Sequence, residues 1–196
     1  MSPIQKLNST ILEPHRLIVL VSILAVVGTT QMLLGGVWDA TSHTLREPES
    51  FWSIQHVAVY SGVAMIASSG IVGSYLLKTK QIDGTLKKGV LIVIIGSIIQ
   101  IAAGYGDSLS HDVFGIDGLL SLSHQPLEFG LVLSTLGGFL IMKANPNNTI
   151  RKFLPVTIVT LILSISWLGF NITLLVGGII LCVPVYEIFS SGCAIL

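Results

Sequence analysis

Charged residues are scarce in this chain. Asp, Glu, Lys and Arg together make up 10% of its 196 residues, and the formal net charge is zero. Ordinary soluble domains carry about 25% charged residues, and nucleic-acid-binding proteins present a basic surface. The composition therefore argues against a soluble domain, and nothing in the charge balance suggests that the chain binds nucleic acid.

Cysteines and recognisable catalytic motifs are also rare or missing. The only cysteines, Cys182 and Cys193, belong to no CxxC or Cys/His cluster, and we interpret both as small apolar fillers. No nucleophile motif, phosphate-binding loop or dinucleotide fingerprint is present. These absences exclude a soluble hydrolase, and the sequence names no catalytic residue.

Long apolar runs dominate what is present, since 52% of the residues are hydrophobic. Runs of about 18 or more apolar residues are typical of membrane-spanning helices. We therefore predict an all-α, polytopic transmembrane bundle of about six spans, the last two divided at a turn formed by Gly169-Phe170-Asn171. No small-residue cleavage site follows the first run, so we expect it to stay as a membrane helix. The predicted spans are 16–38, 54–77, 89–111, 121–142, 153–170 and 172–190.

Charges in the connecting loops predict the orientation. Lys and Arg gather before the first span, between the second and third spans, and between the fourth and fifth. The loops after the first and third spans are mainly acidic. Cytoplasmic loops of membrane proteins carry the excess of Lys and Arg. We expect an integral protein of the cell membrane, with a cytoplasmic N-terminus and acidic loops that face outside.

An internal repeat relates the first two hairpins of this fold. Residues 36–62 align without a gap on residues 104–130, at an offset of 68 positions. We therefore predict a cytoplasmic segment over 1–15, a four-helix module over 16–142 that is a tandem duplication of one helical hairpin, and two further helices over 143–196. The identical aligned pairs are Gly36/Gly104, Asp39/Asp107, Ser42/Ser110, His43/His111, Ser53/Ser121, His56/His124 and Gly62/Gly130.

Each copy carries an Asp-x3-His-x12-His pattern that suits a metal ion. Asp39 and His43 are four residues apart, so they share one face of a helix. His56 follows at the start of the next span, and a tight hairpin brings it to the same membrane depth. Two imidazoles and one carboxylate suit copper, zinc or non-haem iron, with a position left open. The same reasoning applies to the second copy: Asp107, His111 and His124.

Other polar residues near the two patterns have weaker interpretations. Serines beside the ligands are candidates to orient them through hydrogen bonds, and Glu128, one turn after His124, is either such a partner, a proton relay or a packing contact. His15 lies at the other end of the first span and is expected to be interfacial. The alternative for the whole pattern is a set of helix caps or a polar cluster. The candidate orienting serines are Ser42, Ser53, Ser110 and Ser121.

The first pattern resembles the copper site of the C subunit of the particulate methane and ammonia monooxygenases. That resemblance covers residues 36–62 and 104–130, about a quarter of the chain, and implies that Asp39, His43 and His56 are copper ligands. In that family a second site is built from Asn and two His. Here Asp107 stands where the family usually has Asn, which adds a negative charge.

The resemblance implies a copper-binding membrane subunit that works only with partner subunits, in an oligomeric complex surrounded by lipid. No soluble domain is present to deliver electrons, so the chain alone is not expected to be active. Two other hypotheses remain. One is metal delivery or transport, which needs a polar path across the membrane. The other is a structural accessory subunit, in which the clusters bind no metal.

Overall fold

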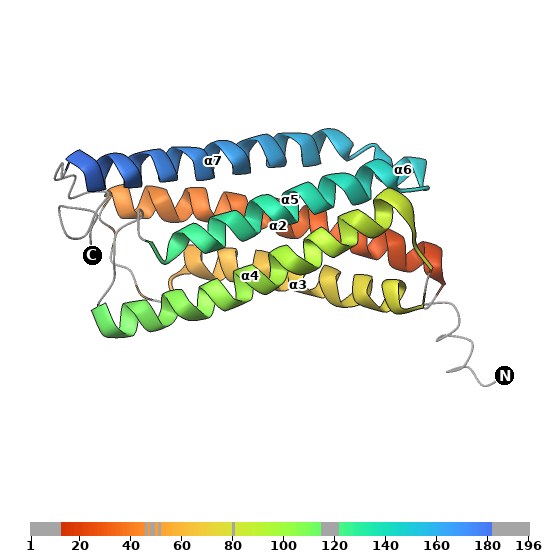
Figure 1. Cartoon of the computed structure of the whole chain (residues 1–196), viewed down its shortest axis with the longest axis horizontal. Coiled ribbons are helices and arrows are strands. Elements are labelled where there is room, and N and C mark those ends of the chain that lie inside the picture. The colour runs from red at the N-terminus through yellow and green to blue at the C-terminus, as the bar shows by residue number, and fades with distance from the viewer. Residues whose placement is uncertain are drawn as a thin grey trace.

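The computed structural model describes residues 13–45, 47, 50, 52–79, 81–114 and 122–181. These residues form an all-helical bundle, as predicted, and five of the helices are long and apolar enough to cross a membrane (Figure 1). The protein is therefore a multi-span membrane protein. Its helices are α2 (Pro14–Leu45), α3 (Ile54–Lys78), α4 (Gly84–Phe114), α5 (His124–Ala144), the single-turn α6 (Asn148–Arg151) and α7 (Leu154–Leu181).

Local sequence explains where several helices begin. Pro14, Pro126 and Pro155 all lie in the first turn of their helices, where proline's missing N–H removes no helical hydrogen bond. Asn147 caps α6, because its side chain accepts from two backbone N–H groups of the first turn. Gly84 opens α4 with a φ of 52°, a left-handed conformation that glycine adopts without strain.

The predicted turn at Gly169-Phe170-Asn171 is wrong. These three residues lie inside α7, which continues unbroken from Leu154 to Leu181. Asn171 is fully buried against α5 and is an interhelical contact. The Gly169 carbonyl also accepts a hydrogen bond from the Thr173 hydroxyl, at 2.7 Å. The predicted spans 153–170 and 172–190 thus belong to one helix as far as residue 181, and 182–190 lie outside the described residues.

Two helices extend well beyond the spans predicted for them. The first continues past residue 38 to Leu45, and the third continues past residue 111 to Phe114. Asp39 and Asp107 therefore lie on helix, at the end where α3 and α5 begin. We call this the site end of the bundle. The fourth helix begins at His124, three residues later than predicted.

Helices α2 to α5 form a closed four-helix bundle. Within hairpins, α2 packs on α3 and α4 packs on α5; between hairpins, α3 contacts α4 and α2 contacts α5. Helix α7 lies along α5 and touches α2 (Figure 1). Each hairpin thus meets the other on both sides, while α7 covers one of these two seams.

Pairs of glycines bring the helices of each hairpin into backbone contact. A Cβ at Gly28 would lie 2.9 Å from the Gly62 carbonyl oxygen. In the second hairpin a Cβ at Gly96 would lie 2.8 Å from the Gly130 carbonyl oxygen. The second pair is 68 positions after the first, so the offset found at the helix ends also relates contacts deep in the apolar spans. Small residues commonly permit such close approach in membrane bundles.

Several described contacts join the two hairpins in the half away from the site end. The Asn145 amide donates to the Ser22 hydroxyl at 2.7 Å, and both side chains are buried. Ala25 faces Gly138 on the same seam, and Gly73 packs on Val90 across the other. The buried apolar side chains of the core belong mainly to helices α2, α3, α4 and α5.

Candidate metal centre

The first Asp–His pair joins the end of α2 to the start of α3. The Asp39 carboxylate Oδ1 lies 2.9 Å from the His56 Nε2. The two side chains are only 15% and 18% exposed. The hairpin therefore brings the Asp and the second His of the first copy together, although 17 positions separate them in the sequence.

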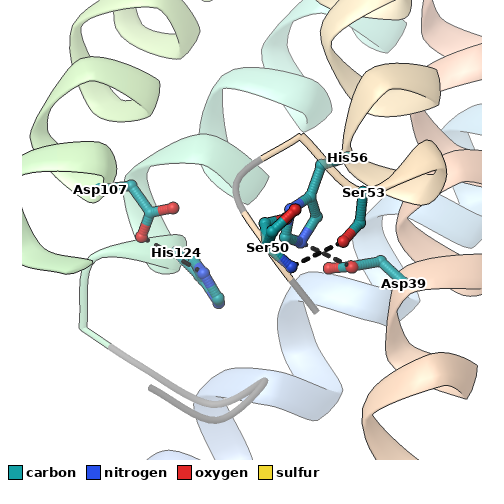
Figure 2. Close-up of polar contacts among 6 residues, drawn as sticks. All are labelled: Asp39, Ser50, Ser53, His56, Asp107 and His124. Carbon is teal, nitrogen blue, oxygen red and sulfur yellow. Dashed lines mark hydrogen bonds and ion pairs between the residues drawn. The ribbon is translucent and has the colours of Figure 1, made fainter. Parts of the chain in front are cut away.

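The second pair repeats this arrangement between α4 and α5. The Asp107 Oδ1 lies 3.3 Å from the His124 Nε2, and the side chains are 14% and 17% exposed. Figure 2 shows the two pairs at the same end of the bundle, each bridging the two helices of one hairpin. The two copies thus place the same atoms in the same relation, at nearly the same burial.

A turn before α3 fixes the orientation of the first imidazole. The His56 Nδ1 lies 2.9 Å from the Ser50 carbonyl oxygen. The Ser50 N–H donates to the Ser53 hydroxyl at 2.7 Å, and the Ser53 N–H donates back to the Ser50 carbonyl at 2.9 Å (Figure 2). Ser53 therefore acts on the histidine through the turn that it closes.

The orientation of the His56 ring determines which of its two nitrogens can bind an ion. A carbonyl oxygen can only accept, so the His56 Nδ1 must carry the proton. The Nε2 then faces the Asp39 carboxylate either with a second proton, as an ion pair, or with a bare lone pair. Two facing lone pairs repel, so the second arrangement requires a cation between them. Metal-binding histidines typically donate their other N–H to a carbonyl or carboxylate in this way.

The measured separations suit two ligands of one metal ion. Nitrogen and oxygen ligands lie about 2.0–2.2 Å from zinc, which places two of them roughly 2.9 Å apart at a right angle and roughly 3.4 Å apart in a tetrahedron. The observed values of 2.9 Å and 3.3 Å fall within this range. The donor atoms present therefore fit a first-row transition metal.

The third predicted ligand of each copy is placed only by its backbone. His43 and His111 lie on α2 and α4, one turn beyond Asp39 and Asp107, but their side chains lie outside the described part of the structure. Among the side chains that are described, no three His, Cys, Asp or Glu residues gather closely enough to hold a metal. The structure thus brings together two of the three predicted ligands in each copy.

The remaining serines differ from one another. Ser42 is buried and Ser110 is half-buried, while Ser121 lies outside the described residues. No side-chain contact to a ligand is recorded for Ser42 or Ser110. Ser53 alone has a described link to a candidate ligand, through the Ser50 turn.

A difference between the copies lies one turn further into the bundle. Tyr60 follows His56 by four residues, and its counterpart after His124 is Glu128, 68 positions later. The Tyr60 ring packs 6.2 Å from the His56 ring, and it interacts electrostatically with both Asp39 and Asp107. Tyr60 therefore lies near both pairs. The repeat aligns Tyr60 with Glu128, and sequence analysis missed the significance of this substitution.

Glu128 is bound by α7. Its Oε1 accepts from the Trp167 indole Nε1 at 3.2 Å and from the Asn171 amide. Among the described residues of the first hairpin, α7 packs on α2, where the Thr30 and Thr160 hydroxyls lie 3.3 Å apart, and not on α3, the helix that carries Tyr60. Of the interpretations that sequence left open for Glu128, an interhelical contact is therefore part of the answer. Glu187, Cys182 and Cys193 lie outside the described residues.

No family model, no curated protein and no solved structure matches this chain. Its class is defined by its own geometry: a multi-span helical membrane protein with two Asp–His pairs at one end of a duplicated bundle.

Proposed function

We propose that this chain is a copper-binding integral membrane subunit of an ammonia- or methane-monooxygenase-like complex. The observation that carries the proposal is the repeated Asp–His pair. Two pairs with separations of 2.9 Å and 3.3 Å, at equivalent places in two hairpins, are hard to explain as helix caps. No capping hydrogen bond is made by the side chains of Ser53 or Ser123, which precede α3 and α5.

The free-energy cost of burying the two Asp–His pairs supports a functional role for them. Ionisable side chains near membrane depth are expensive and are usually retained for function. Each pair is more than four-fifths buried, at the end of an apolar helix. An ion pair alone stabilises such a bundle poorly, because desolvation offsets much of its attraction. A bound cation that neutralises the carboxylate accounts better for keeping two copies.

In this proposal, residues of this chain bind the metal ions and orient their ligands. Asp39 and His56 hold the first ion and Asp107 and His124 hold the second, with His43 and His111 as the third ligands. The Ser50 turn fixes the His56 ring. Copper held there supplies redox chemistry with dioxygen, and partner subunits supply electrons. Small apolar substrates would reach the sites through the surrounding lipid.

The resemblance to the monooxygenase C subunit selects copper among the metals that these ligands accept. Imidazole suits copper, zinc and iron alike, so the assignment needs measurement. The positive-inside pattern of the loops further predicts that the site end faces the outside of the cell membrane. The metal and the orientation of the site end are independent of one another.

The experiment is elemental mass spectrometry of the protein purified in mild detergent without chelator. We expect one or two coppers per chain in the wild type and a loss of both in the His56→Ala, His124→Ala double variant. The His43→Ala, His111→Ala double variant is expected to lose metal as well. His15→Ala is the matched control, since it removes an exposed imidazole at the opposite end of α2 and should keep the metal.

The outcomes separate the hypotheses. Zinc or iron in place of copper would keep the site and overturn the monooxygenase assignment. Equal metal content in the wild type and the double variants would refute metal binding by these residues. A wild type free of metal after growth and reloading with copper would leave the pairs as structural ion pairs.

A further inference from the structure

Helix α7 completes a second polar site, separate from the Asp–His pairs. It lies between α5 and α7, where Glu128 meets Trp167 and Asn171. Asn171 is fully buried, with 0% of its surface exposed. Glu128 is one helical turn from His124, towards the middle of the membrane span.

The hydrogen bonds at this site are unevenly shared between the carboxyl oxygens. Both N–H donors, from the indole and from the amide, go to Oε1 of Glu128. The other oxygen, Oε2, is buried and has no hydrogen-bond partner within the described residues. The Asn171 Oδ1 is also buried and without a partner there. Two buried acceptors on residues that contact each other thus lack a donor within the described part of the chain.

One proton on Oε2 resolves this imbalance. A protonated carboxyl has one carbonyl oxygen that accepts and one O–H that donates. Oε1, with its two donors, matches the carbonyl oxygen. An amide offers an N–H and a C=O side by side, so an acid and an amide can pair through two hydrogen bonds. The Asn171 amide already donates to the acid, and its Oδ1 is the natural acceptor for the Oε2 proton.

Among the described residues no Lys or Arg lies at the site end beside Glu128, and His124, one turn away, is already paired with Asp107. In helices α2 to α5 the Lys and Arg residues lie at the end away from the site, and α7 has no titratable residue between Leu154 and Leu181. A buried carboxylate without a paired cation is costly in an apolar medium. The titratable groups at the site end of the neighbouring helices are Asp39 and His43 on α2, His56 and Tyr60 on α3, Tyr105, Asp107, His111 and Asp112 on α4, and His124 on α5 itself.

We propose that Glu128, Asn171 and Trp167 form a proton-binding site in which Oε2 of Glu128 carries an exchangeable proton at neutral pH. Release breaks the Oε2–H bond, leaves its electron pair on the carboxylate and passes the proton to water. Uptake reverses these steps. The carboxylate keeps its two donors on Oε1, while Oε2 and the Asn171 Oδ1 then face each other as two acceptors. Proton release therefore weakens the contact between α5 and α7.

This proposal does not depend on copper. The first hairpin has Tyr60 in place of Glu128, so the proton-binding site belongs to the second copy alone. It places a proton donor and acceptor beside one of the two Asp–His pairs, whatever ion that pair binds.

Infrared spectroscopy of the protein in lipid tests the proposal. We expect a protonated-carboxyl C=O band at about pH 7, where an ordinary glutamate is ionised. The band should shift in heavy water and should be absent in Glu128→Gln. Glu13→Gln, which removes an exposed carboxyl at the other end of α2, should keep it. Asn171→Leu should move the band to higher frequency, because the O–H loses its acceptor.

Each other result overturns the proposal. A wild type with no such band, or a band that persists unchanged in Glu128→Gln, would show that Glu128 carries no proton. A band that appears only when sodium is replaced by choline would show that a sodium ion fills the space between the two oxygens. If Glu128→Gln does not fold, ¹³C-labelled glutamate in the wild type shows whether the band belongs to a glutamate, and its shift in Asn171→Leu identifies Glu128.

Discussion

Substituting Gly62 by alanine tests the packing that shapes the first hairpin. A Cβ at this position would lie 2.6 Å from the Met32 backbone nitrogen and 2.8 Å from the Gly28 carbonyl oxygen. Non-bonded carbon contacts are comfortable at about 3.5–4.0 Å, so α2 and α3 must move apart by roughly 1 Å at this crossing. Both obstacles are backbone atoms, and no side-chain rotation can relieve them.

The expected loss in free energy of unfolding is about 1–3 kcal/mol, the usual effect of overpacking a well-packed interior. The effect should reach the metal site. His56 lies six residues from Gly62, or about 9 Å along the helix, and the Asp39–His56 separation of 2.9 Å depends on the same helix crossing. We therefore expect weaker metal binding at the first site together with lower stability.

Unfolding in mixed micelles with increasing sodium dodecyl sulfate measures the change. Gly106→Ala is the matched control, since a Cβ there meets no atom within 4 Å and should leave stability unchanged or slightly higher. In the second hairpin, Gly130→Ala should cost less, because the backbone atoms nearest its Cβ are further away, the Gly96 oxygen at 3.0 Å and the Gln100 nitrogen at 3.2 Å. The reasoning fails if Gly62→Ala is as stable as Gly106→Ala.

Two further changes test single polar contacts. Ser53→Ala removes the hydroxyl that accepts from the Ser50 N–H, so metal affinity at the first site should fall by about 10–100-fold; Ser61→Ala, which removes an exposed hydroxyl on the same helix, should leave it unchanged in a titration with copper. Asn145→Ala leaves the buried Ser22 hydroxyl without its amide donor, so unfolding in mixed micelles should show a loss of about 1–3 kcal/mol, and an unchanged midpoint would contradict the importance of this contact.

Much of the fold follows from hydrophobic run length. That signal predicts helices that begin near residues 16, 54, 89 and 121, and the structure has them at 14, 54, 84 and 124. Their edges could not be predicted, because polar residues such as Asp39 and Asp107 continue the helices beyond the apolar runs. The pairing of Asp39 with His56 was foreseen from hairpin geometry alone.

The error at Gly169-Phe170-Asn171 has a physical cause. Glycine and asparagine favour turns when they are exposed, and an apolar stretch of about 38 residues suggests two crossings. Sequence alone could not reveal that Asn171 faces α5, where Glu128 accepts its hydrogen bond. A polar residue inside an apolar run therefore indicated a partner in another helix, and not a break in its own.

Residue spacing in the sequence also could not predict which residues hydrogen-bond to Glu128. Sequence analysis placed Glu128 on the face of His124, one turn away, but Trp167 and Asn171 lie 39 and 43 positions later on a helix outside the repeat. Contacts between a duplicated module and an added helix follow no internal period, so only the folded chain reveals them.

The division of the bundle into two hairpins has a mechanical consequence. Each Asp–His pair lies within one hairpin, and close glycine contacts hold the two helices of that hairpin together. The geometry of each pair is therefore set mainly by packing inside its own hairpin. A change that separates the helices of one hairpin should disturb the pair of that hairpin first and that of the other hairpin less.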